Sequence, residues 1–212
     1  TPAWTMVLTT LLWSSAGVVT RQLAHAQGFE VTFWRSFFTV VSLLLILPLW
    51  QGPRVFARMP WRQGAFWLSG WCWAVMFTAF MVALTMTGVA RVLVTMALGP
   101  LLTALLARVV TGHRLLARTW VAIMLGGAGM AWMFAGQMGE ATSSSAWMGS
   151  LVALGVPAAA AVNWTVVQRS QAHGESIDLV PAVLLGAVIS SAVTFPLAWP
   201  LTAGGRDLAW LA

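Results

Sequence analysis

Long uncharged stretches recur along the chain, separated by short segments that carry arginine or acidic residues. Each stretch has about the length that a helix needs to cross a lipid bilayer, roughly 17 to 25 predominantly apolar residues. The stretches are 1–20, 36–53, 63–90, 92–107, 119–139, 141–168 and 179–205. The shortest is lengthened by Arg108, because a long cationic side chain at a helix end can reach the interface. The pattern predicts an all-helical, polytopic integral membrane protein.

The predicted helices are joined by short connections, as expected for helices that pack beside their neighbours. Their expected ranges are 4–23, 29–50, 64–87, 91–111, 117–136, 147–168 and 178–201. One connection differs from the others, because residues 137–146 are polar and contain Gly139, Glu140 and a run of three serines, 143–145. Such composition is typical of a flexible linker. We therefore expect a five-helix unit over 1–137, a linker over 138–146 and a second unit over 147–212.

An internal repeat supports this division. Shifting the chain by 148 residues aligns 16–50 with 164–198 at nine identical positions without a gap. The identical pairs include Arg21 with Arg169, His25 with His173, Ser42 with Ser190 and Pro48 with Pro196. Five helices separate the two copies, so they enter the membrane in opposite senses, which is the arrangement of inverted-repeat transporters. Residues 207–212 resemble the entrance to an eighth span, and a full second repeat would bring the number of helices to ten.

Composition and charge agree with a membrane bundle. Hydrophobic residues make up 59% of the chain and charged residues 8%, with a formal net charge of +6. The arginines lie at span edges and in short loops, a distribution that indicates membrane orientation and not a nucleic-acid partner. If the first helix leaves the cytoplasm, seven arginines fall in inside loops and three in outside loops. We expect a cytoplasmic N-terminus in a plasma membrane, the inner membrane of a bacterium, with the first segment retained and not cleaved as a signal peptide.

Enzyme and metal chemistry find little support in the sequence. No acidic residue or lysine lies in the middle of any predicted span. The single cysteine, Cys72, cannot form a disulfide within the chain, and His25, His113 and His173 lie in different loops without metal-ligand spacing. No serine has a base near it in sequence. We expect no catalytic residue, no metal and no cofactor.

Several motifs together resemble the EamA repeat of the drug/metabolite transporter superfamily. They are Leu11-Leu12-Trp13-Ser14-Ser15, Arg35, Ala83-Leu84, Pro100-Leu101, Gly112-His113-Arg114-Leu115 and Gly126-Gly127-Ala128-Gly129. The chain departs from the family at His113, where members usually carry Glu. The resemblance implies a ten-helix exporter of amino acids and related metabolites, with residues 1–137 as a complete repeat and 147–212 as the start of a second.

Arg35 is the sharpest candidate for a functional residue, because charges inside membrane helices are costly and tend to serve function. It lies about two turns from the outer end of its helix. Direct contact with a solute, an ion pair with Glu30 and extension to the membrane interface are the three alternatives.

Polar and aromatic groups on other helices are candidates for a cavity lining. Asn163 and Trp164 on the sixth helix match Trp13 and Ser14 on the first, and Thr95 lies on the fourth. An unpaired amide facing lipid costs several kcal/mol, so Asn163 either forms an interhelical hydrogen bond or lines a cavity. An aromatic stripe of the third helix, formed by Trp73, Phe77, Phe80 and Leu84, is interpreted chiefly as packing, with a pocket wall as the alternative.

Two prolines are candidate hinges. Pro100 interrupts the fourth predicted helix and Pro157 the sixth, and each leaves a backbone carbonyl without its helical donor. Small residues of the fifth helix, among them Ala122, Gly126 and Gly127, favour close helix contact within the chain or with a second copy in a homo-oligomer.

The sequence thus predicts an alternating-access transporter that exports small metabolites such as amino acids, with the lipid bilayer and a small solute as its partners. The expected solute-binding residues are Trp13, Ser14, Arg35, Phe80, Thr95, Asn163 and Trp164, and the expected hinges are Pro100 and Pro157. Two other classes remain as alternatives: a non-transporting interaction or sensory bundle, whose interior would be filled by large side chains, and a membrane-embedded lipid-modifying enzyme.

Overall fold

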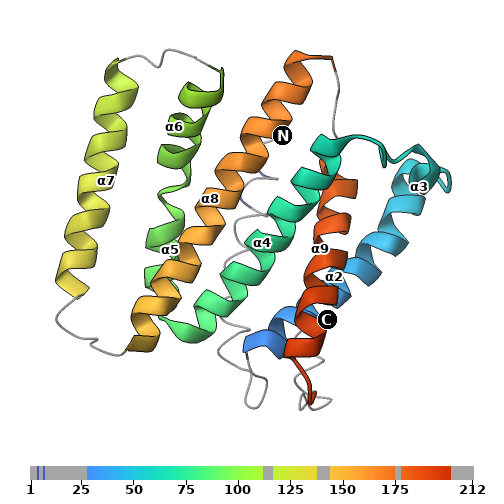
Figure 1. The fold of residues 1–212 in the computed structure, drawn as a ribbon, viewed down its shortest axis with the longest axis horizontal. Coiled ribbons are helices and arrows are strands. Elements are labelled where there is room, and N and C mark those ends of the chain that lie inside the picture. Colours follow the sequence, from blue (N-terminus) through green and yellow to red (C-terminus); the bar gives the residue numbers. More distant parts are fainter. Residues whose placement is uncertain are drawn as a thin grey trace.

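The computed structural model describes Trp4, Val7 and residues 28–111, 117–137, 144–174 and 178–201. Regular structure in these residues is helical throughout (Figure 1). The helices are α2 (Gly28–Gln51), α3 (Val55–Arg58), α4 (Gly64–Met86), α5 (Val89–Met96), α6 (Gly99–Thr111), α7 (Ala117–Gln137), α8 (Ser144–Ala172) and α9 (Leu179–Leu197). The all-helical prediction is confirmed for the part of the chain that the structure describes.

The observed helices follow the predicted ranges with two differences. The predicted helix 91–111 is divided into α5 and α6, and the four-residue α3 between α2 and α4 was not predicted. The predicted first helix, 4–23, lies outside the described residues except for Trp4 and Val7, which are helical. Helix ends elsewhere agree within a few residues because Gly, Pro and Arg punctuate the apolar stretches.

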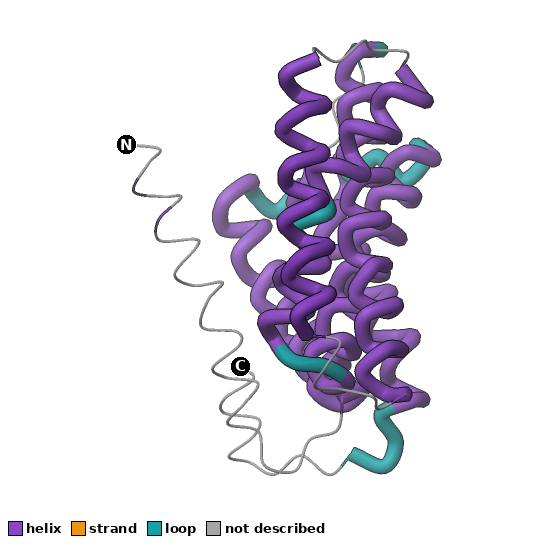
Figure 2. The backbone as a smooth tube through the Cα atoms, turned by 90° about the vertical axis from the view of Figure 1, so that its left-hand side faces the viewer, coloured by secondary structure: helices purple, strands orange, loops and turns teal. Residues whose placement is uncertain are grey.

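Five segments are long and apolar enough to cross a membrane. They are Phe29–Gln51, Gly64–Met86, Val89–Val110, Trp147–Ala172 and Leu179–Leu197. Each spans 19 to 26 residues, which supports a multi-pass membrane protein. Figure 2 shows the same helices standing side by side along one direction. The spanning role of α7 and of the first segment stays a prediction.

The bundle carries large apolar side chains outside and small or polar ones inside. Leu49, Trp50 and Trp132 are 86%, 83% and 84% exposed. Buried positions include many alanines and also Ser69, Thr95, Asn163, Ser190 and Thr194. Without water outside, membrane helices pack through small residues and hydrogen bonds instead of a hydrophobic core, so this distribution is the expected one.

Helices α4, α8 and α9 form the centre of the bundle, and α2 packs on α9 (Figure 1). The Phe33 and Phe195 rings lie 5.3 Å apart, and Gln51 donates a hydrogen bond to Asp178 at 3.1 Å. Early positions of α2 therefore meet late positions of α9, and the two helices are antiparallel. Asp178 also caps α9 by accepting a hydrogen bond from the backbone N–H of Val180 at 3.1 Å, so one carboxylate starts α9 and holds the end of α2.

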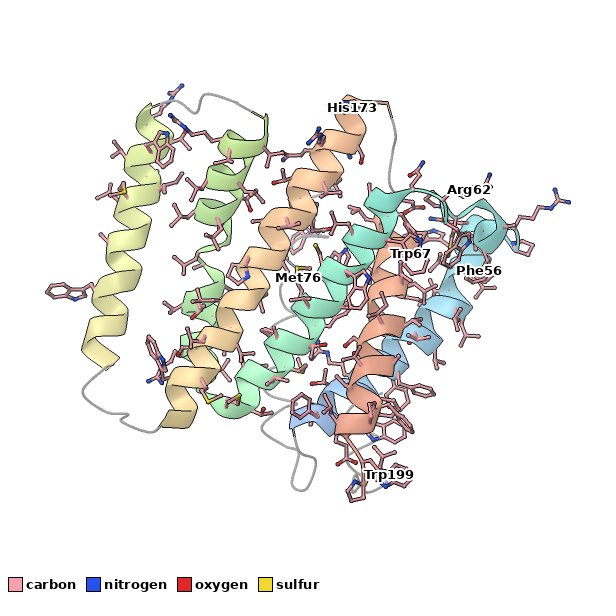
Figure 3. All side chains as sticks on the ribbon, viewed as in Figure 1. Phe56, Arg62, Trp67, Met76, His173 and Trp199 are labelled. Atoms are coloured by element: carbon pink, nitrogen blue, oxygen red, sulfur yellow. The ribbon has the colours of Figure 1, made fainter. Side chains whose placement is uncertain are left out.

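Arginines of the alternate connections gather at one end of the bundle. The α2–α4 connection, the C-terminal end of α6, the start of α7 and the C-terminal end of α8 share this end, which carries Arg62 and His173 (Figure 1 and Figure 3). Trp199, after α9, lies at the opposite end. Among the described residues, Arg62, Arg108 and Arg169 belong to this end, whereas the orientation of the chain in the membrane stays a prediction.

Candidate functional site

A cavity of about 380 Å³ lies between α2, α4, α5 and α8. Its volume is within the range of small-molecule sites. The lining residues are Arg35, Ser36 and Thr39 from α2, Trp73, Met76, Phe77, Phe80 and Met81 from α4, Met96 from α5, and Val156, Ala160 and Trp164 from α8. Met76, at the middle of α4, is labelled in Figure 3. Three of the predicted site residues, Arg35, Phe80 and Trp164, thus share one cavity.

Arg35 contributes the one charged side chain among the lining residues. Its guanidinium makes no hydrogen bond or ion pair with any residue that the structure describes, and Thr39 donates its hydroxyl to the backbone carbonyl of Arg35 at 2.8 Å. Glu30 does not pair with Arg35. Five residues on an α-helix correspond to about 140° around its axis, so the two side chains leave α2 in different directions. Of the three alternatives for Arg35, the ion pair with Glu30 is not observed. The position of Arg35 in a cavity wall favours direct contact with a solute.

An aromatic stripe of α4 forms the facing wall. Trp73, Phe77 and Phe80 follow one another at helical spacing, and the rings of Trp73 and Phe77 are 5.7 Å apart. The fourth member of the predicted stripe, Leu84, is buried in a cluster with Val31 and Val92 instead. The stripe therefore divides into a pocket wall and a packing residue. The indole N–H of Trp73 is buried without an acceptor among the described residues.

Asn163 and Thr95 are the sequence neighbours of the lining residues Trp164 and Met96, but they do not themselves line the cavity. The side-chain carbonyl of Asn163 accepts a hydrogen bond from Ser69 at 2.6 Å, which links α8 to α4. Its amide nitrogen is buried without a partner among the described residues. Thr95 donates its hydroxyl to the carbonyl of Arg91 at 2.8 Å. A solute-binding role for these two residues stays a prediction, and Trp13 and Ser14 lie outside the described residues.

The two candidate hinges meet in the bundle. The helix breaks at Ala97 and Leu98, and Pro100 stands in the first turn of α6, where a proline needs no backbone donor. Pro157 is fully buried inside α8, which continues through it as one helix, so the predicted interruption is a proline held within an unbroken helix. Gly99 faces Pro157, because a Cβ at Gly99 would stand 4.0 Å from the Cβ of Pro157. The break beside α5 therefore packs on the proline of α8.

A cluster of hydroxyl groups that the sequence analysis did not single out joins three helices beside the cavity. Ser190 of α9 lies 3.0 Å from the hydroxyl of Ser36 on α2 and 3.0 Å from that of Thr78 on α4. Ser36 also lines the cavity, and Thr39 stands one turn beyond Arg35 on the same face. Thr39 could have been identified in the sequence, because it follows Arg35 by four residues and therefore lies on the same face of the helix.

Among the described residues, no group of three or more His, Cys, Asp or Glu side chains is placed to hold a metal ion. Comparison with known families matches residues 2–135 to the EamA-like transporter family. Searches of curated proteins and of solved structures find no match.

Proposed function

Because the chain belongs to the EamA-like transporter family, the resemblance seen in the motifs is confirmed, and we propose that this multi-pass membrane transporter exports small metabolites such as amino acids. The proposed mechanism is alternating access: a cavity between helices opens first to one side of the membrane and then to the other. The small solute and the lipid bilayer are the proposed partners.

The observation that carries the proposal is the cavity of about 380 Å³ with Arg35, Phe80 and Trp164 in its wall. A charged side chain inside a membrane helix is costly, and such residues face cavities or partners and mark solute pathways. Aromatic walls with a few polar groups are typical of small-molecule sites. A non-transporting bundle was expected to have an interior filled by large side chains, and this cavity favours the transporter.

Inverted repeats are the second part of the proposal, with units over 1–137 and 147–212 and a linker over 138–146. The contact between α2 and α9 supports it. Under the 148-residue offset, the equivalent of the Phe33–Phe195 contact is a contact between Leu47 and Pro181. Leu47 packs in a cluster with Val180 and Leu184, on either side of Pro181. Any two antiparallel helices are related in this way, so the support for inverted copies comes from the opposite directions of α2 and α9.

The proposed moving parts are the helices that carry Pro100 and Pro157. The α5–α6 break and the buried proline of α8 pack on each other beside Met96, Val156 and Ala160, which line the cavity. Pro157 removes a hydrogen bond inside α8, and the α5–α6 break interrupts the helical hydrogen bonding next to Pro100, so both places can bend at low cost. Bending at this contact would change the cavity wall directly.

The proposed orientation has the N-terminus in the cytoplasm and the arginine-rich end of the bundle inside the cell, in the plasma membrane. Cysteine labelling tests it in a Cys72-free background with single cysteines at Arg58 and Ser144. An impermeant reagent applied to intact cells should modify position 144 and leave position 58 unmodified. Modification of position 58 alone would reverse the orientation.

Transport is tested by reconstituting the complete protein into liposomes and measuring uptake of a panel of radiolabelled amino acids and carboxylic acids, with and without a pH gradient. We expect saturable uptake of at least one solute that is absent from protein-free liposomes. Inhibition of its uptake by an excess of the unlabelled solute distinguishes a binding site from leakage. No saturable uptake of any solute would reject the proposal.

A further inference from the structure

We propose that the Arg35 cavity selects an apolar monoanion, a solute with one carboxylate and an aromatic or branched body but no amine, over the corresponding zwitterionic amino acid. This inference builds on the proposed transport of a small metabolite and, within that class, favours monocarboxylates over the amino acids given above as examples. It depends on the charge, hydrogen-bonding groups and shape of the cavity wall.

The first step is the charge of the wall. Arg35 is the one ionisable side chain among the lining residues, and it has no counter-ion among the described residues. An arginine is never deprotonated under ordinary conditions, so the part of the cavity wall that the structure describes carries a positive charge without a counter-ion. A carboxylate satisfies it best, because the planar guanidinium binds two carboxylate oxygens through paired, charge-assisted hydrogen bonds.

The second step is the shortage of groups that could bind an ammonium. The oxygen-bearing side chains in the wall are Ser36 and Thr39. Thr39 directs its proton to the carbonyl of Arg35 and Ser36 shares a hydrogen bond with Ser190, so each can offer an ammonium only the lone pairs of a neutral hydroxyl. No carboxylate belongs to the lining residues. The wall therefore favours an acceptor-rich ligand.

An α-ammonium would also lie close to Arg35. In an amino acid the ammonium and the carboxylate share one carbon atom, so a carboxylate held by the guanidinium brings the ammonium within a few ångströms of the same positive charge. Like charges at this separation repel strongly where water is scarce. The faces of Trp73, Phe77 and Trp164 can attract a cation, by about 0.5–1 kcal/mol each at exposed sites and about 2 kcal/mol or more when desolvated, but their attraction competes with this repulsion.

The third step concerns the apolar group that the solute carries beside its carboxylate. Beyond Arg35 the wall consists of aromatic and methionine side chains: Trp73, Phe77, Phe80, Met76 and Met96. Aromatic rings contact one another favourably at 4.5–7 Å between centroids, and methionine adapts its shape to an irregular ligand. An aryl or branched alkyl group attached to the carboxylate matches this surface.

Four probes with one common skeleton test the inference. They are 3-phenylpropionate, a monoanion; L-phenylalanine, which adds the ammonium; 3-phenylpropanamide, which is neutral; and phenethylamine, a cation. Binding to the complete protein in lipid nanodiscs is measured by titration calorimetry at neutral pH, with empty nanodiscs as the blank. We expect 3-phenylpropionate to bind at least about tenfold more tightly than each of the other three, since hydrogen bonds to charged groups are worth a factor of ten or more.

Variants assign the preference to Arg35. Arg35→Gln should reduce the affinity for 3-phenylpropionate at least about tenfold and remove the preference over the amide, whereas Arg35→Lys should retain part of it. Arg62→Gln, an exposed arginine in the α3–α4 connection, is the matched control and should leave all four affinities unchanged. Gel filtration shows whether each variant is folded, and if Arg35→Gln is not, Arg35→Lys and the four probes on the unaltered protein decide.

Binding of L-phenylalanine as tight as that of 3-phenylpropionate would overturn the inference, as would binding of none of the probes up to millimolar concentration. Measurements of solute uptake by liposomes distinguish failure of this inference from failure of the proposed function. Amino-acid uptake by liposomes without any preference for the monoanion rejects the inference and leaves the transporter. Selective binding of the monoanion without flux of any solute rejects transport and leaves the selectivity of the cavity.

Discussion

Two stretches of the contact between α4 and its neighbours differ sharply, although they adjoin on the same helix. The closed stretch, formed by Ser69, Gly70, Asn163 and Gly186, is filled: a Cβ on Gly186 would stand 2.9 Å from the carbonyl oxygen of Gly70. The open stretch, Trp73–Phe80 with Trp164, surrounds the Arg35 cavity. In the closed stretch, small residues let the helix axes approach closely. In the open stretch, the large rings of α4 keep α4 and α8 farther apart.

The closed stretch lies between the cavity and the arginine-rich end, because α4 begins at that end and Ser69 precedes Trp73 by one turn (Figure 1). Beyond the cavity α4 is packed closely again, because a Cβ on Gly149 of α8 would stand 2.9 Å from the Cβ of Met86, so close helix contacts bound the open stretch on both sides. Asn163 and Trp164, adjacent on α8, belong to the two different stretches. The comparison predicts that substitutions in the closed stretch affect stability and those in the open stretch affect transport.

The largest effect is expected for Gly186→Leu. The new side chain would collide with the Cβ of Trp73 and with the backbone of Gly70, neither of which can rotate away. Overpacking typically costs 1–3 kcal/mol, and we expect at least about 3 kcal/mol here because backbone atoms must move. Thermal unfolding in detergent and the yield of monodisperse protein measure it. Gly64→Leu at the exposed start of α4 is the control, since no described residue lies within 4 Å of its Cβ position, and equal losses for both variants would show that the α4–α9 contact is not especially tight.

Trp164→Ala should reduce transport about tenfold and stability little. The residue is 42% exposed and lines the cavity, so its removal deletes part of the wall without opening a buried core. Truncating an aromatic anchor of a binding site commonly costs 1–2 kcal/mol or more, about a factor of ten. Initial uptake rates per folded molecule measure the effect. Trp132→Ala on α7, at a residue 84% exposed, is the matched control, and a comparable loss there would mean that the effect does not come from the cavity.

Asn163→Leu should act mainly on stability. The residue is fully buried and bonded to Ser69, and interhelical hydrogen bonds in membranes are worth about 0.6 kcal/mol on average and up to about 1.7. We expect a loss in that range, offset in part because the unpartnered amide nitrogen is removed too. A double-mutant cycle with Ser69→Ala isolates the pair. If Asn163→Leu lowers uptake tenfold at unchanged stability, the residue belongs to the solute site after all.

The helices and the charge pattern could be predicted from the sequence, whereas much of the site could not. The length of an uncharged stretch along the sequence is enough to predict a spanning helix, and the observed ranges of α2, α4, α7 and α9 are close to the predicted ones. Arg35 stood out because charge is rare in such helices. To predict that Asn163 bonds to Ser69 while Trp164 lines the cavity, one must know the direction in which each side chain leaves α8 and which residue of α4 it meets. Met76 and Met96 carried no signal, because methionine is common throughout apolar helices.

The smallest effect, and the most specific to movement, is expected for Pro157→Ala. Alanine restores the backbone N–H that proline lacks, and this N–H can donate to the carbonyl of Ala153 one turn earlier, which stiffens α8 where it faces Gly99. If α8 bends there during transport, the uptake rate should fall a few-fold while solute affinity and thermal stability stay near their original values. Rapid uptake measurements and binding titrations on the same preparation separate rate from affinity. Pro196→Ala, an exposed proline near the end of α9, removes a proline away from the break and should leave the rate unchanged. An unchanged rate in Pro157→Ala would remove α8 from the list of moving helices and leave the α5–α6 break as the remaining candidate hinge.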